Sequence, residues 1–249
     1  MHFHLPKPLH GWRVFVGEVG IIVIGVLIAL GTQKTVEELQ WREEVRLTEE
    51  ALTNEIALSL VSAAERKMVD QCLRDRLAHL ITKIRSKDVR WTADPMQLGN
   101  TKFARIVVAP AAYRAPARDW DISAWDSAKG SGVLSHMPRK LVAAYSAFYA
   151  ALDGQRQSQV VEGETFPELL YLSFDTTLDA QARRQAMSTL GQLDWLNGLA
   201  VNTADDLIDA ARALHLDFSR TNLTRDVAEA ERGQREFRGT CVKHVDLRL

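Results

Sequence analysis

An apolar segment near the start of the chain constrains the fold more than any other feature. Residues 14–31 read VFVGEVGIIVIGVLIALG, and Glu18 is the only charged residue among them. A helix over residues 12–33 would be about 33 Å long at roughly 1.5 Å per residue, close to the ~30 Å hydrocarbon thickness of a membrane. We therefore expect a short tail at residues 1–10 and a transmembrane helix at residues 11–33.

A cleaved signal peptide is the alternative interpretation of this segment. Residues 19–30 have the length of a signal-peptide apolar region, and Ala29-Leu30-Gly31 offers small residues at the spacing of a cleavage site. Against this, Glu18 interrupts the early apolar run, and the chain after Gly31 continues into a helical pattern without a break. These two features favour a retained anchor.

Four residues of the anchor are candidates for contacts at or within the membrane. Glu18 lies five residues after Arg13, near the interface, where water, snorkelling or a partner charge lowers the cost of an ionised group. Gly25 and Ala29 have the small-x-x-x-small spacing that lets two helices approach closely. This spacing indicates a pairing surface for a homodimer.

Basic residues flank the segment on both sides, with Lys7 and Arg13 before it and Lys34, Arg42 and Arg46 after it. The two counts are nearly equal, so they do not fix the orientation by themselves. The short basic tail that precedes the first apolar segment favours a cytoplasmic N-terminus and an external C-terminal domain.

The two cysteines of the chain, Cys72 and Cys241, have neither CxxC spacing nor a nearby pair of histidines. A structural zinc site is therefore not expected. Two interpretations stay open. One is a disulfide, which needs an oxidising compartment and a fold that joins distant segments, and the other is a pair of buried free thiols.

The anchor and the residues after it also carry a resemblance to a known group of proteins. The sequence reads GEV at residues 17–19, IVIGVLIAL at residues 22–30 and WREE at residues 41–44. This pattern resembles a family of uncharacterised bacterial single-pass membrane proteins, in which GEI, a few apolar residues and IGILIAL precede a tryptophan and an acidic helix. The resemblance implies an anchor in the bacterial inner membrane, a helical body and, with the orientation above, a periplasmic C-terminal domain. It names no activity.

Residues 34–90 are expected to form a long amphipathic helix. Residues 36–87 contain neither proline nor glycine, and their apolar side chains recur mostly at steps of four and seven. The charged residues between them, including Glu55 and Arg66, have mixed signs and are typical of a solvated face. The apolar stripe favours packing within a bundle, and a coiled coil between two copies is the alternative.

Residues 91–137 break the helical pattern with three prolines and a Gly-Ser-Gly turn. An Ile-Val-Val run at residues 106–108 has strand character, and a short helix is expected at residues 121–129. This connector also concentrates ring side chains that either line a ligand pocket or cap the core of a bundle. They are Tyr113, Trp120, Trp125 and His136.

Residues 138–249 predict a helical bundle that packs on the long helix. Asp179 suits the N-cap of a helix. Capping-box spacing predicts further helix starts at Thr165 and Asn202, and Gly198 is expected to separate two helices. The predicted fold class is therefore mostly α, with a transmembrane helix, a long amphipathic helix and an antiparallel helical bundle.

The sequence lacks the common motifs of catalysis and of metal or nucleotide binding, including HExxH, GxSxG, GxGxxG and paired CxxC. Its 31 basic and 32 acidic residues give a net charge of -1, which provides no bulk field for nucleic acid. We therefore expect no enzyme, no cofactor and no nucleic-acid partner. Two hypotheses remain: a membrane-anchored interaction or scaffold protein with an envelope partner, and a small-molecule sensor that acts through a partner.

Overall fold

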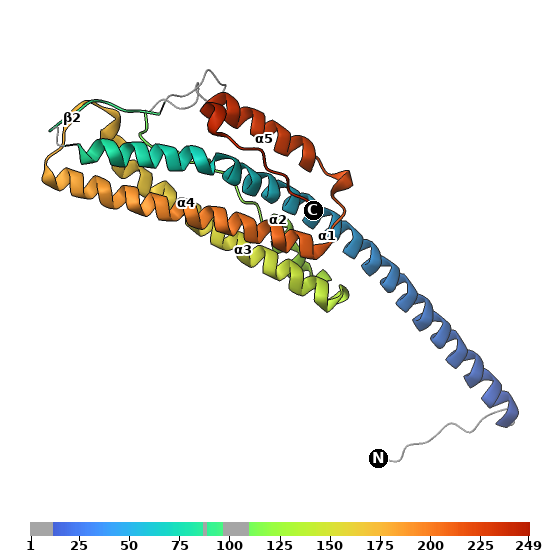
Figure 1. Cartoon of the computed structure of the whole chain (residues 1–249). Helices are drawn as coiled ribbons and strands as arrows, with labels where there is room; N and C mark the ends of the chain where they lie inside the picture. Colours follow the sequence, from blue (N-terminus) through green and yellow to red (C-terminus); the bar gives the residue numbers. More distant parts are fainter. Residues whose placement is uncertain (1–11, 87–88, 97–109) are drawn as a thin grey trace, which may run out of the picture.

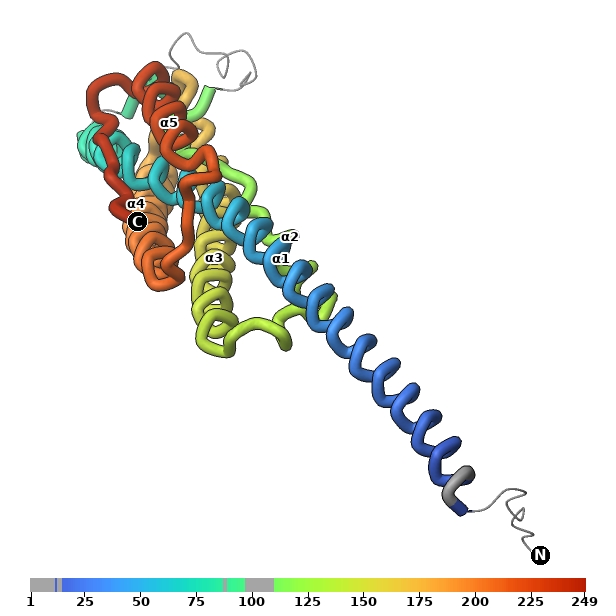
Figure 2. The backbone as a smooth tube through the Cα atoms, turned by 90° about the vertical axis from the view of Figure 1, so that its right-hand side faces the viewer, coloured from blue at the N-terminus to red at the C-terminus, as the bar shows by residue number. Residues whose placement is uncertain are grey.

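The computed structural model describes residues 12–86, 89–96 and 110–249, and these residues are mostly helical, as predicted (Figure 1). The described part contains five α-helices. They are α1 (Trp12–Arg85), α2 (Ser123–Ser131), α3 (Arg139–Thr165), α4 (Ala180–Leu214) and α5 (Leu223–Arg238). Helix α4 packs against both α1 and α3, while α5 lies along α1 on its other side (Figures 1 and 2).

Short elements connect these helices. The 3₁₀ helices are η2 (Val133–His136), η3 (Phe166–Ser173), η4 (Phe218–Arg220) and η5 (Gly239–Cys241). Two short strands, β1 (Arg90–Trp91) and β2 (Thr176–Thr177), pair antiparallel at the end of the bundle farthest from the N-terminus. The run at residues 106–108, for which we predicted strand character, lies outside the described residues.

Helix α1 is one continuous helix that contains both the apolar segment and the centre of the bundle. None of its most apolar 18-residue window is buried in the structure, and this window is long and apolar enough to cross a membrane. Beyond Trp41 the same helix enters the bundle, and from Leu52 onward its apolar side chains are largely buried. The helix continues through the polar residues after the apolar segment, where the hydroxyls of Thr32 and Thr35 donate to carbonyls one turn back.

Helix α1 ends at Arg85, earlier than the predicted boundary at residue 90. The chain then turns into β1, where Trp91 donates from Nε1 to the carbonyl of Leu172 at 2.8 Å. Arg183 of α4 donates hydrogen bonds to the carbonyls of Ile84 and Ser86, which are left without helical partners at the end of α1. A tertiary contact therefore terminates the helix where the local sequence gives no stop signal.

Two of the predicted helix boundaries in the C-terminal half are wrong, and a third is confirmed only in part. The 3₁₀ helix η3 does start after Thr165, but the Thr165 hydroxyl donates to the carbonyl of Val161 in α3 and does not cap the new helix. Gly198 and Asn202 both lie inside α4, which runs without a break. The buried side chains on either side of Gly198 outweigh the ~1 kcal/mol helix penalty of a glycine.

The N-cap at Asp179 is confirmed, because its Oδ1 accepts a hydrogen bond from the backbone N–H of Ala182 at 2.7 Å. Apolar residues of α3 also lie in the core. Tyr145, Phe148 and Leu152 of α3 are fully buried against α1 and α4. Local capping chemistry and periodicity therefore located helices where no tertiary contact competed.

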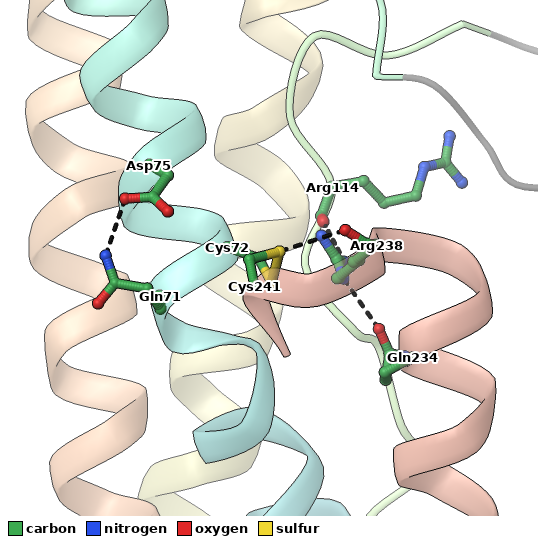
Figure 3. Close-up of a disulfide and its surroundings, with 7 residues drawn as sticks. All are labelled: Gln71, Cys72, Asp75, Arg114, Gln234, Arg238 and Cys241. Atoms are coloured by element: carbon green, nitrogen blue, oxygen red, sulfur yellow. Dashed lines mark hydrogen bonds between the residues drawn. A yellow bond between two sulfur atoms is a disulfide. The ribbon is translucent and has the colours of Figure 1, made fainter. Parts of the chain in front are cut away.

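Cys72 of α1 and Cys241 of η5 form a disulfide that closes a sequence separation of 169 residues (Figure 3). Helix α5 needs this link, because only Leu223 and Val227 of its side chains are buried. The residue after the disulfide, Val242, is buried, and the next N–H, of Lys243, donates to the carbonyl of Met68 at 2.9 Å. The disulfide therefore fixes the end of the chain to the central helix.

Replacing both cysteines, Cys72→Ser with Cys241→Ser, should lower the free energy of unfolding by about 2–5 kcal/mol, because the unfolded chain regains the freedom of a long loop. The measurement is denaturant unfolding of the full chain in detergent. Wild-type protein treated with reductant is the matched control and should show a similar loss, whereas the double variant should not respond to reductant. An unchanged midpoint in the double variant would show that the disulfide does not hold α5.

Candidate functional site

The most unusual feature of the bundle interior is a buried ion pair between Arg66 of α1 and Glu162 of α3. The two side chains are about 4% and 7% exposed. Nη1 and Nη2 of Arg66 donate to the two carboxylate oxygens of Glu162 at 2.9 and 2.8 Å, which is the two-bond geometry that makes such pairs strong. Nη2 also donates to Oδ1 of Asn197 on α4 at 3.1 Å, so one guanidinium joins α1, α3 and α4.

Neighbouring polar groups extend this ion pair. The hydroxyl of Tyr113, in the connector, donates to Glu162 at 2.9 Å, and Nδ2 of Asn197 donates to Asp70 at 2.7 Å. Burial lowers the pKa of Arg66, but the adjacent Glu162 carboxylate outweighs this effect and the net shift is upward. Burial raises the pKa of Tyr113. At neutral pH the network therefore holds one charged guanidinium and one neutral phenol.

A second buried carboxylate, Glu65, joins the connector and α5 to α1. Arg118 of the connector binds both of its oxygens, and Nε2 of Gln234 on α5 donates to Oε1 at 2.9 Å. Gln234 also accepts from Arg238, whose Nη2 donates to the carbonyl of Arg114 at 2.7 Å (Figure 3). Burial lowers the pKa of Arg238 to about 10. Polar contacts of this kind replace an apolar core between α5 and the rest of the bundle.

A third buried carboxylate, Glu55, caps α2 from outside that helix. Its oxygens accept from the backbone N–H groups of Ala124 and Trp125 at 2.7 and 3.4 Å, and from the hydroxyl of Tyr149. A carboxylate at this position satisfies free N–H groups and complements the positive end of the helix. Asp121 accepts from the backbone N–H of Ser123 at 2.9 Å, so the start of α2 is held by one local carboxylate and by Glu55 of α1.

The predicted solvated face of α1 is therefore wrong at three of its charged residues, Glu55, Glu65 and Arg66, which are buried. A sequence signal for Arg66 did exist, because it lies three and seven residues before Val69 and Leu73, on the face that becomes the core. Its partner Glu162 could not be identified in this way, since the pairing depends on how α3 packs.

The four ring residues of the connector do not line one shared pocket. Tyr113 belongs to the Arg66 network, and Trp125 stacks on Tyr149 with ring centroids 4.9 Å apart. His136 is exposed and stacks on Trp41 of α1 at 3.9 Å. The interpretation as a cap on the bundle core therefore holds for Tyr113 and Trp125, and the His136 stack marks the end of the bundle nearest the N-terminus.

Trp120 lines a small cavity between α1, α3 and the connector, with a volume of about 10 Å³. This volume fits a single water molecule and is far below the roughly 300–1,000 Å³ of a typical ligand pocket. No group of three His, Cys, Asp or Glu side chains that could hold a metal ion occurs among the residues that the structure describes. The interior of the bundle therefore offers no space for a drug-sized ligand at this point.

The candidate pairing residues of the anchor all lie on α1. Glu18, Gly25 and Ala29 are exposed along it, and a side chain added at Gly25 would meet nothing within 4 Å. The side chain of Arg13 lies outside the described part of the structure. The small-residue face of Gly25 and Ala29 is thus accessible to lipid or to another helix.

At the end of the bundle farthest from the N-terminus, Asp94 contacts three basic side chains. Arg76, His79 and Lys83 of α1 lie 2.8, 2.7 and 3.0 Å from its carboxylate oxygens. Burial alone would raise the pKa of Asp94, but hydrogen bonds from these basic groups hold it well below its usual value. The cluster fastens the segment after β1 to the last turns of α1.

Removing one partner of the central ion pair should lower the free energy of unfolding more than removing both partners. Glu162→Met leaves the buried Arg66 charge without a counterion and should cost about 3–5 kcal/mol of unfolding free energy. The double change Arg66→Met with Glu162→Met removes both charges and should recover most of that loss. Denaturant unfolding of the variants measures this, and a double variant that loses the sum of the single effects would contradict the coupling.

The Asp94 cluster should make stability depend on pH in the acidic range. Because the folded pKa lies below the unfolded value of about 3.9, Asp94 stabilises the fold at neutral pH, and this contribution is lost as pH falls below ~4. Asp94→Asn should therefore lower the denaturation midpoint at pH 7, and its difference from wild type should shrink on acidification. A difference that stays constant with pH would assign the effect to packing.

No family model, curated protein sequence or solved structure matches this chain. Its function must therefore be argued from α1, the disulfide and the filled bundle interior.

Proposed function

We propose that this protein is a membrane-anchored interaction protein of the bacterial envelope, which holds a disulfide-bonded helical bundle close to the inner membrane. The observation that carries the proposal is that α1 is both the exposed apolar segment and the central helix of the bundle. An exposed apolar helix of this length is stable when lipid covers it. The resemblance of the anchor to bacterial single-pass membrane proteins supports the same location.

The continuity of α1 also sets how far the bundle lies from the membrane. The stack of Trp41 on His136 marks the near end of the bundle. Residues 33–41 of a continuous helix span about 12 Å at roughly 1.5 Å per residue. A bundle held at this distance by a helix without a hinge is suited to meeting partners at the membrane surface.

The disulfide supports a periplasmic location of the bundle. Stable disulfides form in oxidising compartments such as the bacterial periplasm and are rare in the cytosol. A bundle with the Cys72–Cys241 link therefore fits a chain whose basic tail stays in the cytoplasm. The same orientation was favoured by the residues that precede the apolar segment.

An interaction role fits the interior of the bundle better than the alternative role as a small-molecule sensor. The four ring residues expected to line a ligand pocket are spread over separate contacts, and the cavity beside Trp120 has room for one water molecule. The described part of the bundle therefore presents its surface, rather than an internal pocket, to other molecules.

The anchor is tested by alkaline extraction of membranes. Wild-type protein should stay in the membrane pellet, and Val23→Arg with Leu27→Arg should release it, because two charges in the middle of the segment oppose insertion. Leu47→Arg with Leu58→Arg is the matched control, since both leucines are exposed on α1 beyond the segment. Extraction of wild-type protein would refute the anchor, and so would retention of the Val23 and Leu27 variant.

Topology is read on the same protein with a C-terminal tag. In spheroplasts, added protease should remove the tag from a full-length chain, and a thiol reagent should label the cysteines only after reduction. A protected tag would place the bundle in the cytoplasm, and loss of the first ~31 residues would identify the segment as a signal peptide.

A further inference from the structure

Two buried polar atoms, on residues that line the small cavity, make no hydrogen bond to any other described residue. They are Nε of Arg66, a donor, and Oε1 of Gln155 on α3, an acceptor. Both residues are 3% exposed, and both line the cavity. A buried donor or acceptor without a partner is expensive, so native proteins nearly always supply one.

We propose that the cavity is a binding site for one water molecule, which accepts a hydrogen bond from Nε of Arg66 and donates one to Oε1 of Gln155. The volume of about 10 Å³ is at the lower limit for a single water and leaves no room for a larger ligand. A buried water typically makes about three hydrogen bonds. Ser62 and Gln159, which also line the cavity, are the candidates for further contacts.

The charge around the cavity selects a neutral occupant. Arg66 would attract an anion, but the carboxylate of Glu162 also lines the cavity and already balances this guanidinium. An anion would therefore meet a like charge, and a cation would meet Arg66. Water satisfies both orphaned atoms without adding charge.

The connector forms one wall of the cavity, through Pro116, Arg118 and Trp120. Oε1 of Gln159 accepts from the backbone N–H of Arg118 at 2.9 Å and from Nε1 of Trp120 at 3.0 Å, while Nε2 donates to the carbonyl of Arg118 at 2.7 Å. These three bonds hold residues 118–120 over the site. The bound water is thus part of the polar network that joins the connector to α1 and α3.

The sign of one stability change tests this proposal. If water is bound, Gln155→Met removes one of its partners and leaves Nε of Arg66 unsatisfied, so the melting temperature of the full chain in detergent should fall by about 2–4 °C. If the cavity is dry, Gln155 already has an unsatisfied acceptor, and the same change should raise the melting temperature. Gln157→Met, at an exposed position of α3, is the matched control and should have little effect.

A crystal structure of the wild-type chain that resolves ordered waters gives a second, independent readout. Density within hydrogen-bond distance of both atoms would support the site even if the Gln155 variant fails to fold. A cavity without density, or a melting temperature that rises in Gln155→Met, would overturn the proposal. Neither result depends on whether the protein has an interaction partner.

Discussion

The ion pair between Arg66 and Glu162 is the contact on which the arrangement of the bundle depends. An apolar stripe accepts several registers of one helix along another at similar cost, whereas a buried charge accepts only the register that gives it a counterion and hydrogen-bond partners. Tyr113 and Asn197 add partners from the connector and from α4. Sliding α3 by one turn along α1 would separate these groups, so the pair fixes the relative positions of the three longest helices.

Because Arg66 belongs to α1, the same network also fixes the bundle relative to the apolar segment. Helix α1 runs from Trp12 to Arg85, and its apolar residues change from exposed to buried along the way. A movement of the segment would therefore be transmitted directly to the centre of the bundle. The protein differs in this respect from one in which a flexible linker joins anchor and domain, where the domain can turn without its anchor.

The features that the sequence predicts correctly are those set by residues close together in the chain. The apolar segment, the uninterrupted helix after it and the Asp179 N-cap all follow from local periodicity or capping chemistry. The errors at Gly198 and Arg66 share one cause, because in both cases packing against a distant segment outweighed the local preference. The end of α1 belongs to the same class, since Arg183 supplies its cap from almost 100 residues away in sequence.

The disulfide also depends on contacts between segments that are distant in the sequence. Spacing alone left Cys72 and Cys241 as a pair or as two thiols, because nothing local brings residues 169 positions apart together. The structure joins them because α5 runs along α1, so that the residues after α5 lie beside the middle of α1. With only two buried side chains, α5 lacks the apolar contact that usually holds a helix in a bundle. A covalent link and the Glu65 and Arg238 contacts take over that role, and the link requires an oxidising environment. The few apolar contacts of α5 are therefore compensated by the disulfide and by these polar contacts.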